Sequence, residues 1–436
     1  MNRRLGLVIL APLALLAGAL TGVVCALFRL TLESLGAWRD ALALGWEGPA
    51  WRGALLFAAA AAAACAAAAA LVKRLSPDAN GSGIPHVEAV LVGQAAPARI
   101  LLLPVKFVGG ALAIGAGLAL GREGPCVQMG ATVAHIFGGL LRRGDAERRI
   151  LLAAGAGAGV AAAFDAPLAG AVFVLEELLR RLELRSVVAA LGASTSAILV
   201  SHAILGERSE FIIPHLPPPG LFVTAACLSL GVVAGLLGVV NNRLILGALD
   251  VADAVRLPAE LRAGIVGACV GALAFAAPPL VGGGVGLAQD ALTGAPALSI
   301  LFAALALRLL LGAASYAAGT PGGLFAPLLA VGTLAGALFG RLVDPAAGAS
   351  APFYPLVAMA ALFAAMVRAP LTGVILVTEM TDSSAALLPM AAACFSAMGV
   401  AALLGDAPIY DALRMRGRRP APAAGGLTPP QPGTER

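Results

Sequence analysis

Two stretches of this chain, FDAPLAGAVFVLEE at Phe164–Glu177 and VRAPLTGVILVTEM at Val367–Met380, are versions of one another. Six of the fourteen aligned positions are identical at an offset of 203 residues. The shared positions include an Ala-Pro-Leu triplet and a glutamate, which is Glu176 in the first copy and Glu379 in the second. Proline is favoured in the first turn of a helix, so each stretch predicts an apolar helix that begins at its Ala-Pro-Leu triplet.

A second pair of segments repeats at nearly the same spacing. GREGPCVQMG at Gly121–Gly130 aligns with GLFAPLLAVG at Gly323–Gly332 at an offset of 202 residues. Chance matches among abundant alanines do not reproduce paired glycines and prolines at one spacing. We therefore predict two homologous halves, at about 1–205 and 206–410.

The composition places this repeat in a membrane. Of the 436 residues 60% are hydrophobic and 12% charged, and the mean hydropathy is +0.92. A soluble domain is about half apolar and about a quarter charged. Runs such as Ala54–Leu71 lack the alternation of a barrel strand, so the spanning elements are helices. The length fits roughly ten to fourteen membrane segments.

Several apolar stretches are too short to cross a bilayer and are interrupted by glycine or proline. Helices that break in mid-membrane produce this pattern, and homologous halves commonly enclose a site where they meet. We predict an all-α polytopic membrane protein with two halves of inverted topology and many tilted, broken helices. Residues 1–410 form one transmembrane domain in this interpretation, and residues 411–436 form a short disordered cytoplasmic tail.

Arginine and lysine clusters set the predicted orientation, because short loops rich in these residues stay in the cytoplasm. Both termini are then cytoplasmic, in the inner (plasma) membrane, and the segments 37–52 and 206–219 are external loops. The clusters placed inside are Lys73, Arg74, Arg142, Arg143, Arg148, Arg149, Arg180, Arg181, Arg185 and the tail arginines Arg414, Arg416, Arg418 and Arg419.

Several classes of protein are excluded. The six cysteines are scattered without a CxxC spacing, which indicates small buried hydrophobes and no metal site. The formal charge of +5 is modest and clustered at loops, so we expect no nucleic-acid partner. The chain has no HExxH pair, no G-x-S-x-G elbow and no phosphate-binding loop, so we expect neither an enzyme nor a cofactor.

Three segments share the form of a helix start: GSGIP at 81–85, GREGP at 121–125 and GLFAP at 323–327. Glycine lets the backbone turn closely, and the first amides after it have no intrahelical partner. Each helix start carries roughly half a positive charge. Several of them aimed at one point bind an anion without a full cation, and the anion can leave again. Ser82 and Tyr410 are candidate hydroxyl donors.

Carboxylates in apolar surroundings are the other candidates. Glu123 lies at the start of the second of these helices, and an intramembrane carboxylate is a functional hypothesis; the alternative is a salt bridge to Arg122. Glu176 and Glu177 end an apolar helix, where a charge pair facing water near Arg180 is the alternative.

Two other residues are interpreted structurally. Lys106 lies in an apolar run and needs a counter-charge, for which Glu88 is a possible partner. His86 follows GSGIP and is expected at a solvated cytoplasmic position without a role.

The three motifs, in this order and at these separations, resemble the signature motifs of the CLC chloride channel and transporter family. IYDAL at Ile409–Leu413 resembles the late tyrosine motif of that family, and the resemblance covers nearly the whole membrane portion. It implies that Glu123 is the external gating glutamate and Glu177 the internal proton-transfer glutamate, with Glu176 beside it. It implies a chloride site formed by Ser82, Gly83, Ile84, Gly124, Leu324, Phe325 and Tyr410.

The resemblance also implies a function and an assembly. A carboxylate at Glu177 favours an exchanger of chloride for protons, and the alternative is a passive chloride channel, since channels of the family commonly lack it. Ser82 favours chloride over fluoride or nitrate. Members of the family are homodimers, and the segments that resemble the dimer contact are 167–178, 187–203, 370–380 and 387–403.

Overall fold

The computed structural model describes residues 3–207, 209–213, 216, 219–294, 296–345 and 352–417. In these ranges the chain folds into helices and short helical turns, and no strand is formed. Seven helices are long and apolar enough to cross a membrane, and four further apolar helices are shorter. The prediction of an all-α polytopic membrane protein with broken helices is confirmed.

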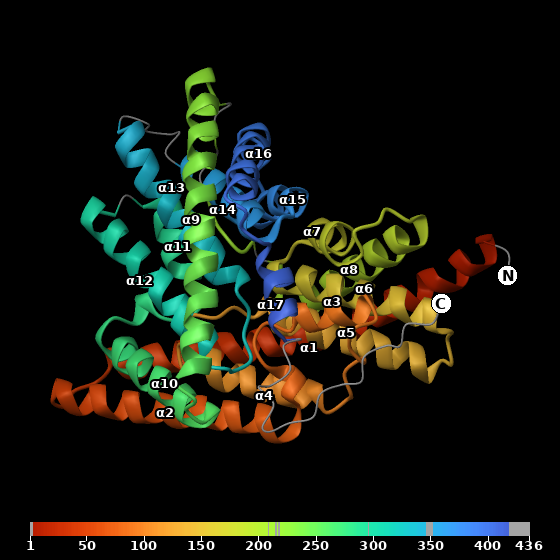
Figure 1. Ribbon diagram of the computed structural model, residues 1–436, viewed down its shortest axis with the longest axis horizontal. Helices are drawn as coiled ribbons and strands as arrows, with labels where there is room; N and C mark the ends of the chain where they lie inside the picture. Colours follow the sequence, from red (N-terminus) through yellow and green to blue (C-terminus); the bar gives the residue numbers. More distant parts are fainter. Residues whose placement is uncertain are drawn as a thin grey trace, which may run out of the picture.

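The helices follow one another with short connections (Figure 1). Those of the first half are α1 (Arg3–Leu44), α2 (Ala50–Leu75), α3 (Ile84–Leu91), α4 (Leu102–Gly115), α5 (Glu123–Leu140), α6 (Asp145–Phe164), α7 (Pro167–Phe173) and α8 (Leu184–Leu205). Those of the second half are α9 (Leu221–Ala254), α10 (Ala259–Ala276), α11 (Val285–Thr293), α12 (Leu298–Ala317), α13 (Phe325–Val343), α14 (Phe353–Val367), α15 (Pro370–Thr381), α16 (Leu387–Leu403) and α17 (Ile409–Gly417). Short turns lie at η1 (Pro77–Ala79), η2 (Val174–Leu178) and η3 (Pro278–Leu280).

The two halves repeat the same succession of elements. Helices α7 and α15 both begin at the proline of Ala-Pro-Leu, and α8 and α16 begin at Leu184 and Leu387, again 203 residues apart. The preceding helices α6 and α14 end in the same way, because Asp165 and Arg368 both adopt the left-handed conformation with φ of 58° and 70°. The sequence repeat is therefore a repeat of structure, including the sharp turn before each Ala-Pro-Leu helix.

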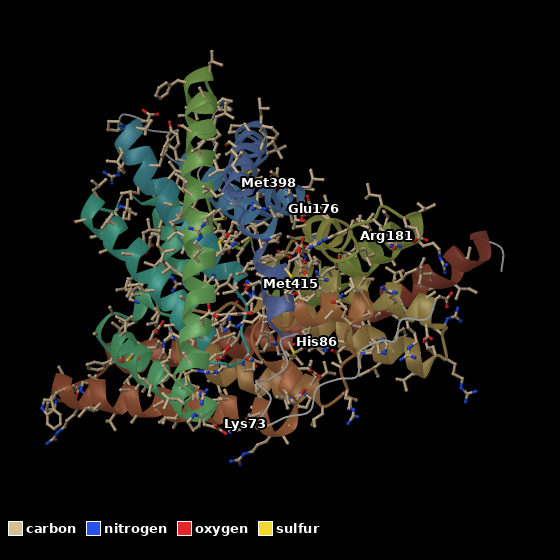
Figure 2. The ribbon with its side chains drawn as sticks, viewed as in Figure 1. Lys73, His86, Glu176, Arg181, Met398 and Met415 are labelled. Carbon is tan, nitrogen blue, oxygen red and sulfur yellow. The ribbon has the colours of Figure 1, made fainter. Side chains whose placement is uncertain are left out.

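A glutamate from each half caps the start of a helix in the other half. Glu379 at the end of α15 accepts hydrogen bonds from the amides of Leu168 and Ala169 at the start of α7, at 3.0 and 2.7 Å. Glu176 in η2 accepts them from Leu371 and Thr372 at the start of α15, at 3.0 and 2.7 Å. Glu176 lies where α7 and α15 meet (Figure 2). The carboxylates therefore satisfy amides that lipid could not.

The interior is built on α6 and α14. Every residue of α14 is buried, and the helix is surrounded by α9, α13, α15 and α16. In the other half α6 packs so tightly on α5 and α7 that a Cβ on Gly159 would come within 2.6 Å of the Cys126 carbonyl carbon. The glycines of Gly155–Gly159 thus serve close helix packing, as small residues do in membrane proteins.

The end of the chain differs from the prediction. Disorder was expected from residue 411, but Ile409–Gly417 is the helix α17, which packs on α3 and α14. Arg416 pairs with Asp250 and Asp253 of α9 at 2.5 and 2.6 Å, so this arginine of the predicted tail has partners from a distant helix. The rest of the predicted tail, 418–436, lies outside the described residues.

The reciprocal caps predict matched effects on stability. Replacement of Glu379 or Glu176 by alanine leaves two amides at a helix start without acceptors, and each change is expected to lower stability by about 2 kcal/mol. The measurement is the thermal unfolding midpoint of the purified protein in a mild detergent. Glu183→Ala, an exposed position just before α8, is the control. A midpoint for Glu379→Ala equal to that of the control would contradict the capping role.

Candidate functional site

Three helix starts are tied together by backbone hydrogen bonds. Gly121 and Gly323 exchange two of them, with N···O distances of 2.8 and 2.7 Å. The Gly81 amide donates to the Thr320 carbonyl at 3.1 Å, and the Gly322 amide donates to the Gly81 carbonyl at 3.0 Å. The segments before α3, α5 and α13 therefore meet, as their shared sequence form predicted.

Glycine is required where these segments touch. Gly83, directly before α3, has φ of +85°, a conformation that other residues rarely adopt. A Cβ on Gly124 would collide with the Ser82 hydroxyl and come within 3.0 Å of Gly323 Cα. Because no side chain fits here, the backbones of Ser82, Gly124 and Gly323 are in direct contact.

The Ser82 hydroxyl is the polar group of the first segment. Ser82 is fully buried, and its Oγ makes no hydrogen bond within the described part of the protein. Nearly every buried polar side chain in a native protein has a partner. A buried hydroxyl free to donate, beside a cluster of helix starts, is suited to an anion.

Lys106 supports this segment from behind, although its partner is not the predicted one. Its buried ammonium donates to the Gly81 and Ala79 carbonyl oxygens at 2.7 and 3.1 Å. The expected pair with Glu88 is wrong, since the Glu88 carboxylate lies 3.8 Å from Arg414. The turn before α3 points its carbonyl groups at α4, and the lysine takes them as acceptors in place of a carboxylate.

Phe325 and Tyr410 join the third helix start to the end of the chain. Phe325 opens α13, and its ring stacks on Phe363 at 5.0 Å and meets Tyr410 edge-on at 5.8 Å between centroids. Tyr410 belongs to α17, is 1% exposed, and is carried toward α3 by the contact between the two helices. Its hydroxyl thus lies inside the protein with the aromatic residues that open α13.

Glu123 lies where the segments before α3, α5 and α13 meet. Its side chain is 2% exposed, and its Oε2 accepts a hydrogen bond of 3.4 Å from the Ala326 amide in the first turn of α13. The carboxylate also lies against Gly121, where any Cβ would collide with Oε2. The carboxylate of one half therefore occupies the helix start of the other half, where an anion is expected to bind.

Arg122 points away from Glu123 and has other partners. Its guanidinium pairs with Glu210 at 2.6 Å and donates to the Ala163 carbonyl at 3.0 Å. Glu210 also pairs with Arg29 at 3.1 Å and is 6% exposed in its side chain. The alternative of an Arg122–Glu123 salt bridge is not realised among the described residues. The linker between the halves supplies the counter-charge instead.

Glu177 lines a hollow in the protein surface to which none of the three helix starts contributes. The turn η2 that carries it is π-helical, a local widening that is frequent at functional sites. Glu177 is 3% exposed, lies 3.6 Å from Arg180, and lines a surface hollow of about 660 Å³. Its neighbour Glu176 lines the same hollow but accepts the hydrogen bonds of the cap on α15, so the two glutamates have different partners.

A chain of ion pairs connects this region to α3. Arg180 binds Asp411 at 3.0 Å, Asp411 binds Arg414 at 2.6 Å, and Arg414 lies 3.8 Å from Glu88. Both oxygens of the buried Glu88 lack a hydrogen bond within the described residues. Glu88 thus joins the side of the molecule that carries Glu177.

A second hollow leads to the helix starts themselves. It has a volume of about 550 Å³ and reaches Gly81 and Gly83. Its wall includes Arg262, Arg414, Arg416 and His86 together with Asp78 and Asp253, and Arg416 is paired with Asp253. His86 was expected in solvent, but its side chain is only 16% exposed and lies 4.0 Å from Asp78. His86 lies below Met415 of α17 in Figure 2.

Sequence reasoning missed Glu210 and Tyr316 in this region and gave Glu88 the wrong partner. Glu210 and Glu88 act through partners from distant helices, so no local pattern reveals these pairs. Tyr316, buried in α12, lies so near the first segment that a Cβ on Gly81 would be 3.0 Å from its hydroxyl. Glu88 and Tyr316 lie in helices and Glu210 lies in the linker between the halves, and an isolated glutamate or tyrosine at such positions also fits an ordinary structural residue.

The fold and the site define a class: a helical membrane protein whose halves bring helix starts, a buried hydroxyl and a carboxylate to one point. The described residues contain no group of three or more His, Cys, Asp or Glu able to hold a metal. Residues 64–402 match the family model described as voltage gated chloride channel. The chain belongs to this family.

Similar proteins cover nearly the whole chain. An H(+)/Cl(-) exchange transporter ClcA of Vibrio parahaemolyticus is 38% identical over 93% of this chain and 89% of its own. One of Cronobacter sakazakii is 38% identical over 92% of this chain and 89% of its own. A crystal structure of a slow cyanobacterial Cl-/H+ antiporter superposes with a TM-score of 0.89 at 32% identity, over 94% of this chain and 97% of that chain.

The two lysines of the chain allow a matched test of the site. Lys106→Met leaves the Ala79 carbonyl without this donor and the Gly81 carbonyl with the Gly322 amide alone, so the turn that carries Ser82 is less well held. We expect chloride affinity to fall by about tenfold, measured by calorimetric titration. Lys73→Met removes an exposed lysine that points outward in Figure 2 and leaves affinity unchanged. Unchanged affinity in Lys106→Met would show that this lysine does not shape the site.

Proposed function

We propose that this chain exchanges chloride for protons across the inner membrane of a bacterial cell. The observation that carries the proposal is the carboxylate of Glu123 at the start of α13, beside the unpartnered hydroxyl of Ser82. Anion and proton transport are then linked through one side chain. The names of the similar proteins, which are chloride–proton exchangers, support the same activity.

Chloride rests where the helix starts meet. The Ser82 hydroxyl, the Tyr410 hydroxyl and the amides that open α13, at Leu324 and Phe325, hold the ion, and the Ile84 and Gly124 amides line the same place, with Gly83 making the turn. These groups offer partial charges alone, which bind an anion and still release it. Arg262, which forms no ion pair with the described residues, lines the hollow that leads there and favours the entry of anions.

Glu123 is the gate. As a carboxylate it occupies the place of an anion at the start of α13, and its single 3.4 Å hydrogen bond is weak enough to exchange. On protonation it loses the charge that holds it there, and chloride takes its place. Each replacement of carboxylate by chloride therefore loads one proton on the same residue.

The proton reaches Glu123 from the arginine-rich side, which is cytoplasmic in this proposal, by way of Glu177. The hollow that Glu177 lines is separate from the one that reaches Gly81, so protons and chloride have different routes on this side. Glu176 does not exchange protons with the hollow, because its carboxylate caps α15; it holds the turn that positions Glu177.

The protein acts as a homodimer in this proposal. Helices α8, α7, α15 and α16 pack in that order into one continuous face, on the same side of the molecule in Figure 1. Large apolar side chains on this face are exposed in the single chain, among them Leu199, Leu371 and Phe395 at 65%, 63% and 80%. The segments named from the sequence, 167–178, 187–203, 370–380 and 387–403, form this face.

The first test is proton pumping in liposomes. A chloride gradient across vesicles that contain the protein is expected to drive protons uphill, recorded with a pH electrode. In Glu123→Gln the gate is permanently neutral, so chloride flux continues and proton movement falls to that of protein-free vesicles. Glu47→Gln, at an exposed position, keeps both fluxes. Full coupling in Glu123→Gln would refute the gate, and flux without uphill protons in the native protein would identify a channel.

The second test separates the inner proton site from the gate. Glu177→Gln is expected to lose proton movement while chloride flux persists, because Glu123 still opens toward the outside. Glu176→Gln keeps coupling if its amide oxygen still caps α15, and Glu183→Gln, exposed nearby, leaves both fluxes unchanged. If Glu176→Gln abolished coupling and Glu177→Gln did not, the assignment of the two neighbours would be reversed.

A further inference from the structure

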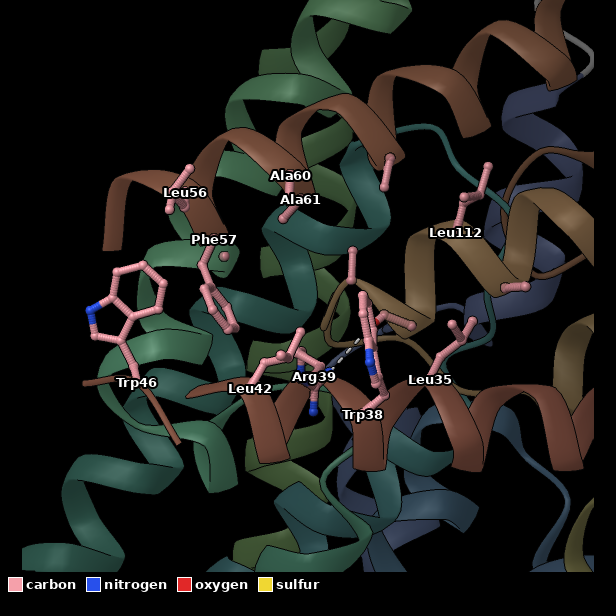
Figure 3. Close-up of a pocket in the computed structure, with 15 residues that line it drawn as sticks. Leu35, Trp38, Arg39, Leu42, Trp46, Leu56, Phe57, Ala60, Ala61 and Leu112 are labelled. Carbon is pink, nitrogen blue, oxygen red and sulfur yellow. Dashed lines mark hydrogen bonds between the residues drawn. The ribbon is translucent and has the colours of Figure 1, made fainter. Parts of the chain in front are cut away.

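An apolar hollow outside the transport route lies between the outer part of α1, α2, α4 and α10 (Figure 3). Its volume is about 490 Å³, within the usual range of ligand pockets. Trp38 and Leu42 of α1 face Leu56 and Phe57 of α2 across it, and Trp46 closes one end. Among the described residues that line it, Arg39 alone is charged.

Small residues create the space. The wall formed by α2 consists of Ala60, Ala61 and Ala64, and Gly115 ends α4 on the opposite side. Helix α2 cannot move to fill the gap, because it is locked on α10: a Cβ on Gly267 would come within 2.6 Å of the Ala61 carbonyl oxygen. The ring of Phe275 further braces Phe57 at 5.4 Å. The hollow is therefore a consequence of rigid helix packing.

The hollow opens on the surface that faces lipid. Trp38 and Leu56 at its rim are 65% and 57% exposed, and both helices that carry them are membrane spans by length and composition. Water is disfavoured in an apolar cavity. The charge of Arg39 is already matched, since Asp40 accepts its hydrogen bond at 2.9 Å and the Gly115 carbonyl another at 3.3 Å.

We propose that this hollow binds one acyl chain of a bilayer phospholipid. The lining is apolar along its length, the opening faces the source of such chains, and tryptophans are typical of the membrane interface at which a chain begins. The alanine wall of α2 receives the chain itself, and Arg39, whose charge is matched by Asp40, lies among the lining residues.

A second copy of the protein does not fit as the occupant. The proposed subunit face includes α8, which packs on the N-terminal half of α1 within the same chain where Gly22 meets Ala197. Trp38 is 16 residues further along the helix, which places the hollow roughly 24 Å away from that contact. The occupant therefore comes from the lipid.

Tryptophan fluorescence tests the proposal directly. The chain has three tryptophans, and Trp51→Phe leaves only Trp38 and Trp46, which both line the hollow. This variant, in detergent micelles, is titrated with phosphatidylcholine whose acyl chains carry bromine, a contact quencher. Quenching is expected to saturate at a low lipid fraction. Adding Ala64→Phe, which fills the hollow, raises the lipid fraction at half-maximal quenching by about tenfold.

Matched controls separate the bound chain from surrounding lipid. Ala63→Phe places the same ring on the exposed side of α2, outside the hollow, and leaves the titration unchanged. Ala60→Phe, at an exposed rim position, is the second filling variant if Ala64→Phe does not fold. Quenching that rises in proportion to lipid in all variants overturns the proposal.

Mass spectrometry of the intact protein gives an independent readout. The native protein is expected to retain one phospholipid in the gas phase that Ala64→Phe or Ala60→Phe loses and Ala63→Phe keeps. Loss of the dimer, without loss of lipid, in the filled variants would make the hollow an interface between copies and overturn the proposal.

Discussion

The structure depends on one constraint: a helix that starts inside a bilayer exposes backbone groups that lipid cannot satisfy. Here the turns before three such helices satisfy one another. Gly121 and Gly323 exchange backbone hydrogen bonds, and Gly81 bonds to the segment at Thr320–Gly322. Lys106 donates hydrogen bonds to the Ala79 and Gly81 carbonyl oxygens of the first turn. The amides at the helix starts remain without partners. The hydrogen bonds that allow the helices to start inside the membrane therefore also leave a site for an anion.

The same physical contact, a carboxylate at a helix start, is used in two ways. Glu176 and Glu379 each accept two amides at 2.7 and 3.0 Å and hold the two halves together. Glu123 accepts one amide at 3.4 Å at the start of α13. A bond of the first kind is expected to be permanent, and one of the second kind is weak enough for an anion to replace it. All three residues are glutamates, so residue type does not distinguish the structural carboxylates from the transporting one. The number and length of their hydrogen bonds do.

Local patterns predicted what depends on neighbours in sequence. The repeat located the starts of α7 and α15, and the Gly–Pro motifs located α3, α5 and α13, because turn and helix chemistry is local. Partners that come from distant helices were not predictable. Lys106 has no nearby acid, and a carbonyl acceptor leaves no mark in the sequence. The arginines of α17 have the composition of a solvated tail, and the partners of Arg416, two aspartates of α9, could not be read from the local sequence.

Arg122 shows why pairing matters as much as position. It adjoins the gate in sequence, and a bare guanidinium directed at the site would hold an anion too tightly for transport. Glu210, from the linker between the halves, pairs with Arg122 at 2.6 Å, and the same carboxylate also pairs with Arg29. Glu33 also lies 2.7 Å from Arg29 and 3.7 Å from Arg122, so two glutamates balance the two arginines beside the site, and partial charges at the helix starts remain for chloride. The linker thus helps to keep the site weakly positive, which both a halide and a carboxylate require if they are to alternate there.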